Sequence, residues 1–266
     1  MHRNSLRPTA APSYSGDSSA SARAITPSPL HVALPGYLTK HERIAIPGVA
    51  DLTIRSLLDR MQYADPFGDA ERIGISSAAW PLFGLLWPSG AHLAARLAAR
   101  PVRAGERILE VGCGLALASI VGHRRGADVT ASDCHPLAAS FLRQNLRLNE
   151  LAPMPYRHGD WAAVEPARHG RVPGGRPVYG RFDLVIGSDL LYERDDRATL
   201  AGFIGRHANP AAEVWIVDPD RGNRAAFNRE MAGLGFARRE ELLVTPAVAG
   251  AAAYKGRMLV YARSAS

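Results

Sequence analysis

The chain has 266 residues, of which 47% are hydrophobic and 21% are charged, and its formal net charge is +7. This length and apolar content suffice for one sizeable core, so we expect a single domain with an N-terminal extension. The basic residues are almost all arginines scattered along the chain, and the only lysines are Lys40 and Lys255. Charge of this kind indicates no dedicated phosphate-binding face, so the composition disfavours a nucleic-acid partner.

Cysteine content and apolar runs exclude further classes of protein. Cys113 and Cys134 are too few for a disulfide framework and do not match a zinc spacing, so we predict no metal site and a reducing, cytoplasmic setting. The uncharged run 73–95 is interrupted by two prolines, three glycines and a histidine. We therefore expect a buried helix followed by a turn there, and no membrane span.

The N-terminal part divides into two segments. Residues 1–30 are rich in serine, alanine and proline and lack the apolar core of a secretory signal. A disordered tail is the first interpretation, and an organelle transit peptide is the alternative. Residues 31–104 are expected to form an extension over the functional site, with one or two short strands within 43–59 and an amphipathic helix around 77–100.

From residue 105 onward, short apolar runs alternate with helical patterns. The predicted strands are 106–112, 128–133, 181–189, 212–220, 237–244 and 256–263, and the predicted helices are 115–125, 135–151, 197–208 and 223–236. Residues 165–181 are rich in glycine, proline and arginine and are predicted to form a loop. This order predicts an α/β fold with a parallel, doubly wound sheet, whose ligand lies at the carboxyl ends of the strands.

The stretch ILEVGCG runs from a predicted strand into a turn with Gly112 and Gly114. A dinucleotide-binding turn has a third glycine, which is missing here. Glu110 precedes Gly112 by two positions, and a carboxylate there would repel a pyrophosphate. It suits a cationic ligand instead. S-adenosylmethionine carries a sulfonium and an ammonium group and no phosphate.

Two later segments fit the same ligand. Asp133 ends the second strand 21 residues after Gly112, where an acid can bond both hydroxyls of a ribose. In the segment GDW, Asp160 can accept from an adenine amine and Trp161 can cover the adenine ring. These features, in this order and spacing, predict a site for S-adenosylmethionine.

Each of these residues also has a purely structural interpretation. The glycines could belong to an ordinary turn, Asp133 could cap the helix that follows it, and Trp161 could be a core residue. Cys113 lies between the glycines, in the part of the turn that faces the ligand. No partner base is evident for it, so we interpret it as a small packing residue and not as a nucleophile.

With these residues in hand, the chain resembles the Rossmann-like, seven-strand S-adenosylmethionine-dependent methyltransferases. Their motif E/D-x-G-x-G-x-G matches residues 110–116, with alanine in the last position. More narrowly, the chain is similar to the family-16 protein-lysine methyltransferases, the group that includes the enzyme acting on the electron transfer flavoprotein β-subunit. LLWPSG, with Trp87, and SDLLYE, with Asp189 and Tyr192, carry this narrower match.

The resemblance implies a fold and a set of roles. The fold is a mostly parallel seven-stranded sheet with an antiparallel last strand, in a methyltransferase core over 105–266. Trp87 lies against the cofactor and Ser188 beside it. For the acceptor, we expect Asp189 to accept a hydrogen bond from the incoming ammonium and to orient it, with a general-base role as the alternative, and Tyr192 to offer the face of its ring. A strand-end cap and a rim aromatic are the alternatives for Asp189 and Tyr192.

Three functions stay open at this point. The leading hypothesis is transfer of a methyl group from S-adenosylmethionine to a lysine of a protein, with S-adenosyl-L-homocysteine as product. The second is a methyltransferase for a small amine or other metabolite, because a fold does not determine its substrate. The third is a catalytically silent, cofactor-binding interaction module. The segment SDLLY lacks the two prolines of N-P-P-Y, which argues against adenine-N6 or glutamine as acceptors.

Overall fold

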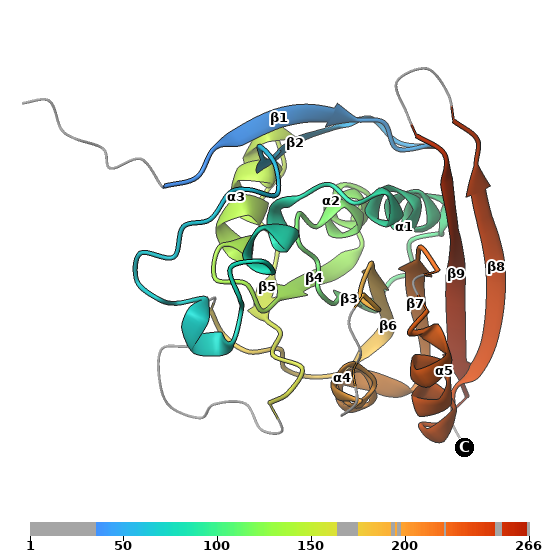
Figure 1. Cartoon of the computed structure of the whole chain (residues 1–266). Helices are drawn as coiled ribbons and strands as arrows, with labels where there is room; N and C mark the ends of the chain where they lie inside the picture. Colours follow the sequence, from blue (N-terminus) through green and yellow to red (C-terminus); the bar gives the residue numbers. More distant parts are fainter. Residues whose placement is uncertain are drawn as a thin grey trace, which may run out of the picture. The chain divides into compact units, whose positions relative to one another are not determined.

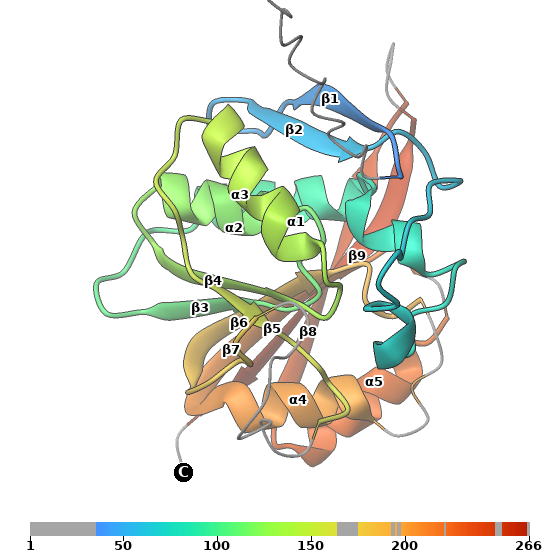
Figure 2. The same cartoon turned by 90° about the vertical axis from the view of Figure 1, so that its left-hand side faces the viewer.

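The structure is a computed structural model that describes residues 36–163, 175–192, 195, 198–220, 222–247 and 252–264. The predicted tail, residues 1–30, and most of the loop predicted at 165–181 lie outside these ranges. Within them, a seven-stranded sheet has α1, α2 and α3 on one face and α4 and α5 on the other (Figure 1, Figure 2). No helix of the described ranges is both long and apolar enough to cross a bilayer.

The sheet has the order β5-β4-β3-β6-β7-β9-β8. Its strands are β3 (Arg107–Glu110), β4 (Asp128–Asp133), β5 (Tyr156–His158), β6 (Phe182–Ser188), β7 (Ala208–Asp218), β8 (Ala237–Thr245) and β9 (Tyr254–Arg263). β9 runs antiparallel to both of its neighbours, and the other pairs are parallel. The predicted fold class is thus confirmed. The sequence pattern missed β5, because three residues are too few to show a period.

Apolar side chains on both faces of the sheet explain its long apolar runs. The helices are α1 (Pro88–Ala99), α2 (Leu117–Arg124), α3 (Ala138–Leu148), α4 (Thr199–His207) and α5 (Arg224–Gly233). Ile108 of β3 belongs to the core cluster under α1, α2 and α3, whereas the next residue, Leu109, belongs to the cluster under α4 and α5. Because successive side chains of a strand point to opposite faces, a sheet covered on both sides needs such continuous apolar strands.

The strand order also creates the place for a ligand. The chain leaves β3 toward β4 and β5, and later returns to place β6 on the other side of β3. Loops therefore diverge at the carboxyl ends of β3 and β6, which opens a crevice there. The two strands stay joined up to this point, since the Val111 N–H donates to the Ile186 carbonyl at 2.9 Å.

The prediction of one helix around 77–100, with a turn after it, is wrong. The structure has a 3₁₀ turn at Trp80–Gly84 and begins α1 only at Pro88, so the turn precedes the helix. Trp87 is extended, with φ −106° and ψ 133°. A residue before proline is pushed out of the helical region, and a proline ring is tolerated only in the first helical turn. Pro88 therefore starts the helix instead of lying within it.

Of the one or two short strands expected within 43–59, β2 (Leu52–Leu57) lies in that range, whereas its antiparallel partner β1 (Thr39–Ile44) lies mostly before it. Two asparagines one turn apart, one within α3 and one directly after its last residue, bind the open edge of β2. The Asn145 side chain accepts from the Arg55 N–H at 2.8 Å and donates to the Arg55 carbonyl at 3.3 Å. Asn149 does the same at Thr53, at 3.0 and 2.8 Å. Side-chain amides thus replace the neighbouring strand that an edge otherwise lacks.

We expect Asn145→Ala to lower the free energy of unfolding by about 2 kcal/mol, because the variant leaves the Arg55 N–H and carbonyl without a buried partner. Urea denaturation followed by circular dichroism measures this change. Arg147→Ala alters an exposed side chain of the same helix and serves as the control. Equal stability of the two variants would show that the amide clamp does not hold the hairpin.

Candidate active site

A cleft of about 960 Å³ opens at the carboxyl ends of β3, β4 and β6. This volume is typical of sites for small molecules and cofactors. The cleft is lined by all eleven residues that the sequence singled out: Trp87, Glu110, Gly112, Cys113, Gly114, Asp133, Asp160, Trp161, Ser188, Asp189 and Tyr192. The fold therefore brings the predicted residues together, while the role of each stays a prediction.

Positive backbone angles shape the turn after β3. Gly112 and Gly114 have φ of +56° and +51°, a conformation that residues with a side chain rarely adopt. A Cβ at Gly114 would lie 2.9 Å from the Phe83 carbonyl oxygen, and a Cβ at Gly112 would lie 2.5 Å from Cδ2 of Leu190. Ala116 adopts φ +60° despite its side chain, just before α2 begins. The backbone conformation thus favours glycine at both positions, and close packing against the Phe83 backbone also excludes a side chain at Gly114.

Glu110 is a buried acid at the start of this turn. Glu110 is only 3% exposed. Its Oε2 accepts a hydrogen bond from the Ser119 N–H, in the first turn of α2, at 2.8 Å. Burial raises the pKa of the Glu110 carboxyl to about 7. The hydrogen bonds from Ser119 oppose this rise, and the neighbouring Asp133 charge adds to it.

Asp133 is a second buried acid in the same cleft. Its Oδ2 accepts the Gly114 N–H and its Oδ1 accepts the His135 N–H, both at 2.8 Å. Burial raises the pKa of the Asp133 carboxyl, and these backbone hydrogen bonds oppose the rise. The helix α3 begins further on, after Leu137, without a side-chain cap. The acid therefore joins the glycine turn to β4 and does not cap α3, and its carboxylate retains lone pairs for further donors.

The segment after β5 forms another wall of the cleft. Asp160 is exposed, and its Oδ1 accepts the Ala162 N–H at 2.9 Å. Trp161 is partly buried against the cluster under α4 and α5, and its ring lies 3.3 Å from where a Cβ of Gly112 would be. The indole thus packs on the core and still lines the cleft. Trp161 is thus in part a core residue, and its role over an adenine ring stays a prediction.

Trp87 and Cys113 line the cleft with side chains that we do not expect to react. The Trp87 Nε1–H donates to the Leu82 carbonyl at 2.9 Å, which fixes the indole beside the start of α1. Burial raises the pKa of the Cys113 thiol well above its ordinary value, and the Asp133 charge acts in the same direction. The thiol is therefore protonated near neutral pH, in agreement with a packing role and not with a nucleophile.

Asp189 directly follows β6 and has a strained backbone. Its φ is +56°, and the residue is only 8% exposed. Its N–H donates to the Val217 carbonyl of β7 at 3.0 Å. Tyr192 lies three residues later on the rim and is 45% exposed. A non-glycine residue held in the left-handed region at the end of a central strand is a feature that clusters at functional sites.

The sequence analysis missed two histidines of the cleft, His135 and His158. The His135 ring stacks on Phe83 at 3.7 Å, and its Nδ1 accepts the Leu137 N–H at 3.2 Å. Burial lowers the pKa of His135 to about 3, so the ring is neutral and carries its proton on Nε2. Burial also lowers the pKa of His158. Each histidine lies two positions from a predicted acid, and this spacing was the available signal.

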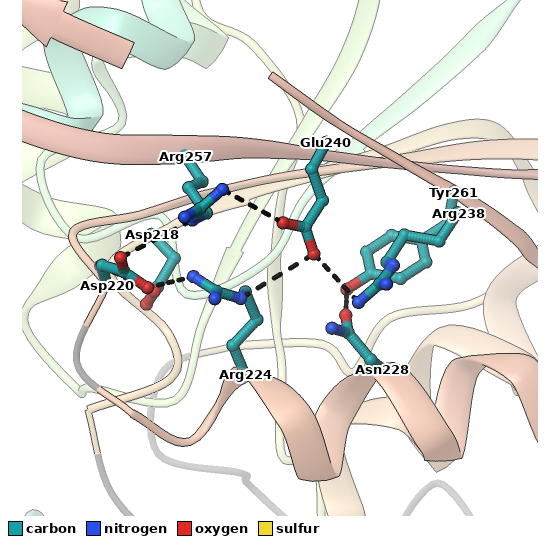
Figure 3. A network of polar contacts seen from close by, with 8 residues as sticks. All are labelled: Asp218, Asp220, Arg224, Asn228, Arg238, Glu240, Arg257 and Tyr261. Carbon is teal, nitrogen blue, oxygen red and sulfur yellow. Dashed lines mark hydrogen bonds and ion pairs between the residues drawn. The ribbon is translucent and has the colours of Figure 1, made fainter. Parts of the chain in front are cut away.

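Asp218, the acid at the end of β7, is not among the residues that line the cleft. It belongs to a network of polar contacts shown in Figure 3. Its Oδ1 accepts the Asp220 N–H at 2.8 Å. Asp220 pairs with Arg224 of α5 and, at 3.5 Å, with Arg257 of β9. Arg257 also pairs with Glu240 of β8 at 3.4 Å. This network ties the loop after β7 to α5 and to the β8–β9 hairpin.

No metal site accompanies the cleft in the described ranges, where no three His, Cys, Asp or Glu side chains are grouped to hold an ion.

The raised pKa of Glu110 predicts a pH-dependent stability. A carboxyl whose pKa is higher in the folded than in the unfolded chain stabilises the fold at low pH, and this contribution is lost as pH rises through about 7. Glu110→Gln does not titrate and keeps an acceptor for Ser119. We expect the variant to gain up to about 3 kcal/mol over the wild type between pH 5 and pH 8.

Thermal unfolding at both pH values measures this gain, with the exposed Glu150→Gln as the matched control. A difference in Tm between Glu110→Gln and wild type that is the same at pH 5 and pH 8 would contradict the raised pKa of Glu110.

The sequence of the chain is similar in part to those of known methyltransferases. No family model matches the chain. It is 40% identical over 144 residues to the electron transfer flavoprotein beta subunit lysine methyltransferase of Danio rerio, over 53% of this chain and 51% of that protein. It is 31% identical over 135 residues to a histone-arginine methyltransferase of Xenopus laevis, over 49% of this chain and 54% of that protein. The chain thus spans about half the length of the curated relatives it matches.

Among solved structures, the fold is similar to the 16S rRNA N2 G1207 methyltransferase of T. thermophilus, with a TM-score of 0.51 and 17% sequence identity. The match covers 85% of this chain and 51% of that chain, and at this identity it concerns the fold alone. In sequence and in fold, the chain resembles the seven-strand S-adenosylmethionine-dependent methyltransferases, and in sequence it resembles the electron transfer flavoprotein β-subunit lysine methyltransferases.

Proposed function

We propose that the chain is an S-adenosylmethionine-dependent methyltransferase that acts on a lysine side chain of a protein. The observation that carries the proposal is the pair of buried acids, Glu110 and Asp133, on either side of the glycine turn in one cleft. Two desolvated carboxylates attract a cation and repel a pyrophosphate. The sequence similarity to a lysine methyltransferase supports the choice of acceptor.

The residues of the cleft fit the chemical groups of this cofactor. Glu110 suits its cationic amino-acid part, and Asp133 has lone pairs for the ribose hydroxyls. Asp160 and Trp161 suit the adenine, and Trp87 and Ser188 complete the walls. Two buried ring nitrogens, Nε2 of His135 and Nδ1 of His158, have no hydrogen-bond partner within the described part of the chain and are available to a polar ligand. When bound, the cofactor supplies a methyl group activated by the adjacent sulfonium.

The acceptor side of the site consists of Asp189 and Tyr192. A lysine has an ordinary pKa of about 10.4, so its ammonium group must lose a proton before it can attack the methyl carbon. Asp189 accepts a hydrogen bond from this ammonium group and orients it, and Tyr192 supplies a π-face. Transfer of the methyl group from the bound cofactor to Nζ would release the lysine proton to solvent and leave S-adenosyl-L-homocysteine. A cytoplasmic setting stays a prediction from composition.

Binding of S-adenosylmethionine should depend on pH through Glu110. Because a cation favours the ionised carboxyl and the pKa is about 7, the Kd should rise about 10-fold from pH 8 to pH 6. Isothermal titration calorimetry with the wild type and Glu110→Gln measures it. The variant should bind more weakly at pH 8 and show a flatter profile. Equal profiles would mean that Glu110 does not meet a cation.

Methyl transfer should depend on Asp189. We expect Asp189→Asn to lower transfer from labelled S-adenosylmethionine by about 100-fold while the Kd of the cofactor stays unchanged, because the variant loses the charge that orients the ammonium group. The acceptors are purified electron transfer flavoprotein β-subunit and a lysate of the source organism, resolved by size. Asp128→Asn, exposed at the opposite end of β4, is the matched control.

A labelled protein band that requires Asp189 supports the proposal, and mass spectrometry then identifies the modified residue. Label found only in the small-molecule fraction would contradict a protein acceptor and favour a metabolite. No label from a protein that binds the cofactor would favour the silent interaction module.

A further inference from the structure

Residues 58–75, which we call the mouth loop, display large apolar side chains on the surface. Met61 is 84% exposed and Phe67 is 80% exposed, while Leu58 and Tyr63 are 40% and 50% exposed. Side chains of this size gain by leaving water, at roughly 25 cal/mol per Å² of buried apolar surface. All four fall within ten consecutive positions of one loop, and exposed apolar side chains that gather on a surface are typical of a binding site.

The mouth loop borders the cleft described above. Arg60, Arg72, Ile73 and Ile75 of the loop line that cleft together with the glycine turn. The charge of Asp65 also acts on His135, which lies in the same cleft. The exposed apolar side chains therefore belong to the segment that forms part of the entrance to the site.

Internal hydrogen bonds hold the mouth loop in shape. The Asp65 carboxylate accepts the Ala70 N–H at 3.0 Å and the Glu71 N–H at 2.9 Å. The Arg72 guanidinium donates to the Phe67 carbonyl at 2.8 Å and pairs with Asp69. The loop thus presents Phe67 on a preorganised scaffold, which reduces the entropy lost when a partner binds.

A ring contact and a longer-range hydrogen bond anchor the first half of the loop. The Tyr63 ring meets the buried Trp80 ring edge-on, with centroids 5.7 Å apart. The Gln62 side chain accepts the Leu38 N–H, 24 residues earlier, at 2.7 Å. Met61 directly precedes these two anchored residues, and its own N–H donates to the Asp59 carboxylate at 2.8 Å. Its exposure is therefore a property of the folded loop.

The mouth loop also differs in charge from the rest of the molecule. The whole chain has a formal net charge of +7, whereas the loop is net negative. Methionine and aromatic residues on an acidic background suit a protein surface that is basic and partly apolar. They do not suit a nucleic acid, whose phosphates the acids would repel. The charged residues of the loop are Asp59, Arg60, Asp65, Asp69, Glu71 and Arg72.

We propose that the mouth loop is the docking surface for the acceptor protein, and that this partner is a folded protein presenting the target lysine within a basic surface that has an apolar patch for Met61 and Phe67. The inference rests on the proposed function and specifies its substrate class. A small amine would need only the cleft, whereas an acceptor that docks on Met61 and Phe67 must bring a surface of its own.

The test compares intact protein and peptide as acceptors. The probes are the purified electron transfer flavoprotein β-subunit and a synthetic peptide around the lysine that takes label in it. We expect Met61→Ser/Phe67→Ser to raise KM for the intact subunit at least about 10-fold, with kcat, the Kd of S-adenosylmethionine and turnover of the peptide unchanged. Leu242→Ser/Val244→Ser removes similarly exposed apolar side chains from the edge strand β8 and is the matched control.

The outcomes separate the two proposals. An unchanged KM for the intact subunit overturns docking on the mouth loop and leaves methyl transfer standing. Loss of cofactor binding or of peptide turnover in the double variant also overturns docking on the mouth loop, because the loop would then be needed to hold the cleft in shape. A wild type that sediments as a dimer, with a monomeric double variant, assigns the surface to self-association instead. A wild type that labels neither this subunit nor any lysate protein removes the proposed function, and the docking proposal falls with it.

Discussion

The site depends on one carboxylate, that of Asp133, which binds backbone N–H groups on two elements. It accepts from Gly114 in the turn after β3 and from His135 after β4. These hydrogen bonds fix the relative position of two adjacent strand ends, where the crevice of a doubly wound sheet opens. Since the turn also needs left-handed angles at Gly112 and Gly114, the cleft has its shape before any ligand enters.

The two buried acids of the cleft destabilise the ligand-free fold but favour the binding of a cationic ligand. Glu110 and Asp133 are desolvated in one cleft, and burial raises the pKa of both carboxyls. Folding would be easier with neutral side chains there, because removal of a charge from water is unfavourable unless an opposite charge replaces the lost hydration. A cationic ligand provides such a charge. The acids that weaken the ligand-free fold are therefore the groups that we expect to select the cofactor.

We expect the core and the choice of acceptor to be specified by different parts of the chain. Proteins that resemble this chain are named for lysine, arginine and ribosomal RNA acceptors, so the shared core does not determine the acceptor. Two segments outside the strands of the sheet line the cleft here: the mouth loop, and the stretch that carries Asp189 and Tyr192. The β1–β2 hairpin, held on α3 by Asn145 and Asn149, leads directly into the mouth loop and so anchors it.

By itself, the sequence determined the features whose causes are local. The apolar runs of β3, β4 and β6 and the compact motif at 110–116 indicated the fold class and the glycine turn, because neighbouring residues specify a strand, a turn and a helix start. It did not reveal β5 or the two histidines of the cleft. These depend on partners far along the chain: β5 exists by pairing with β4, and His135 is buried because it stacks on Phe83. The exposure of Met61 and Phe67 was likewise decided only by the tertiary structure, since apolar residues in a sequence are expected inside, and only packing shows which of them stay outside.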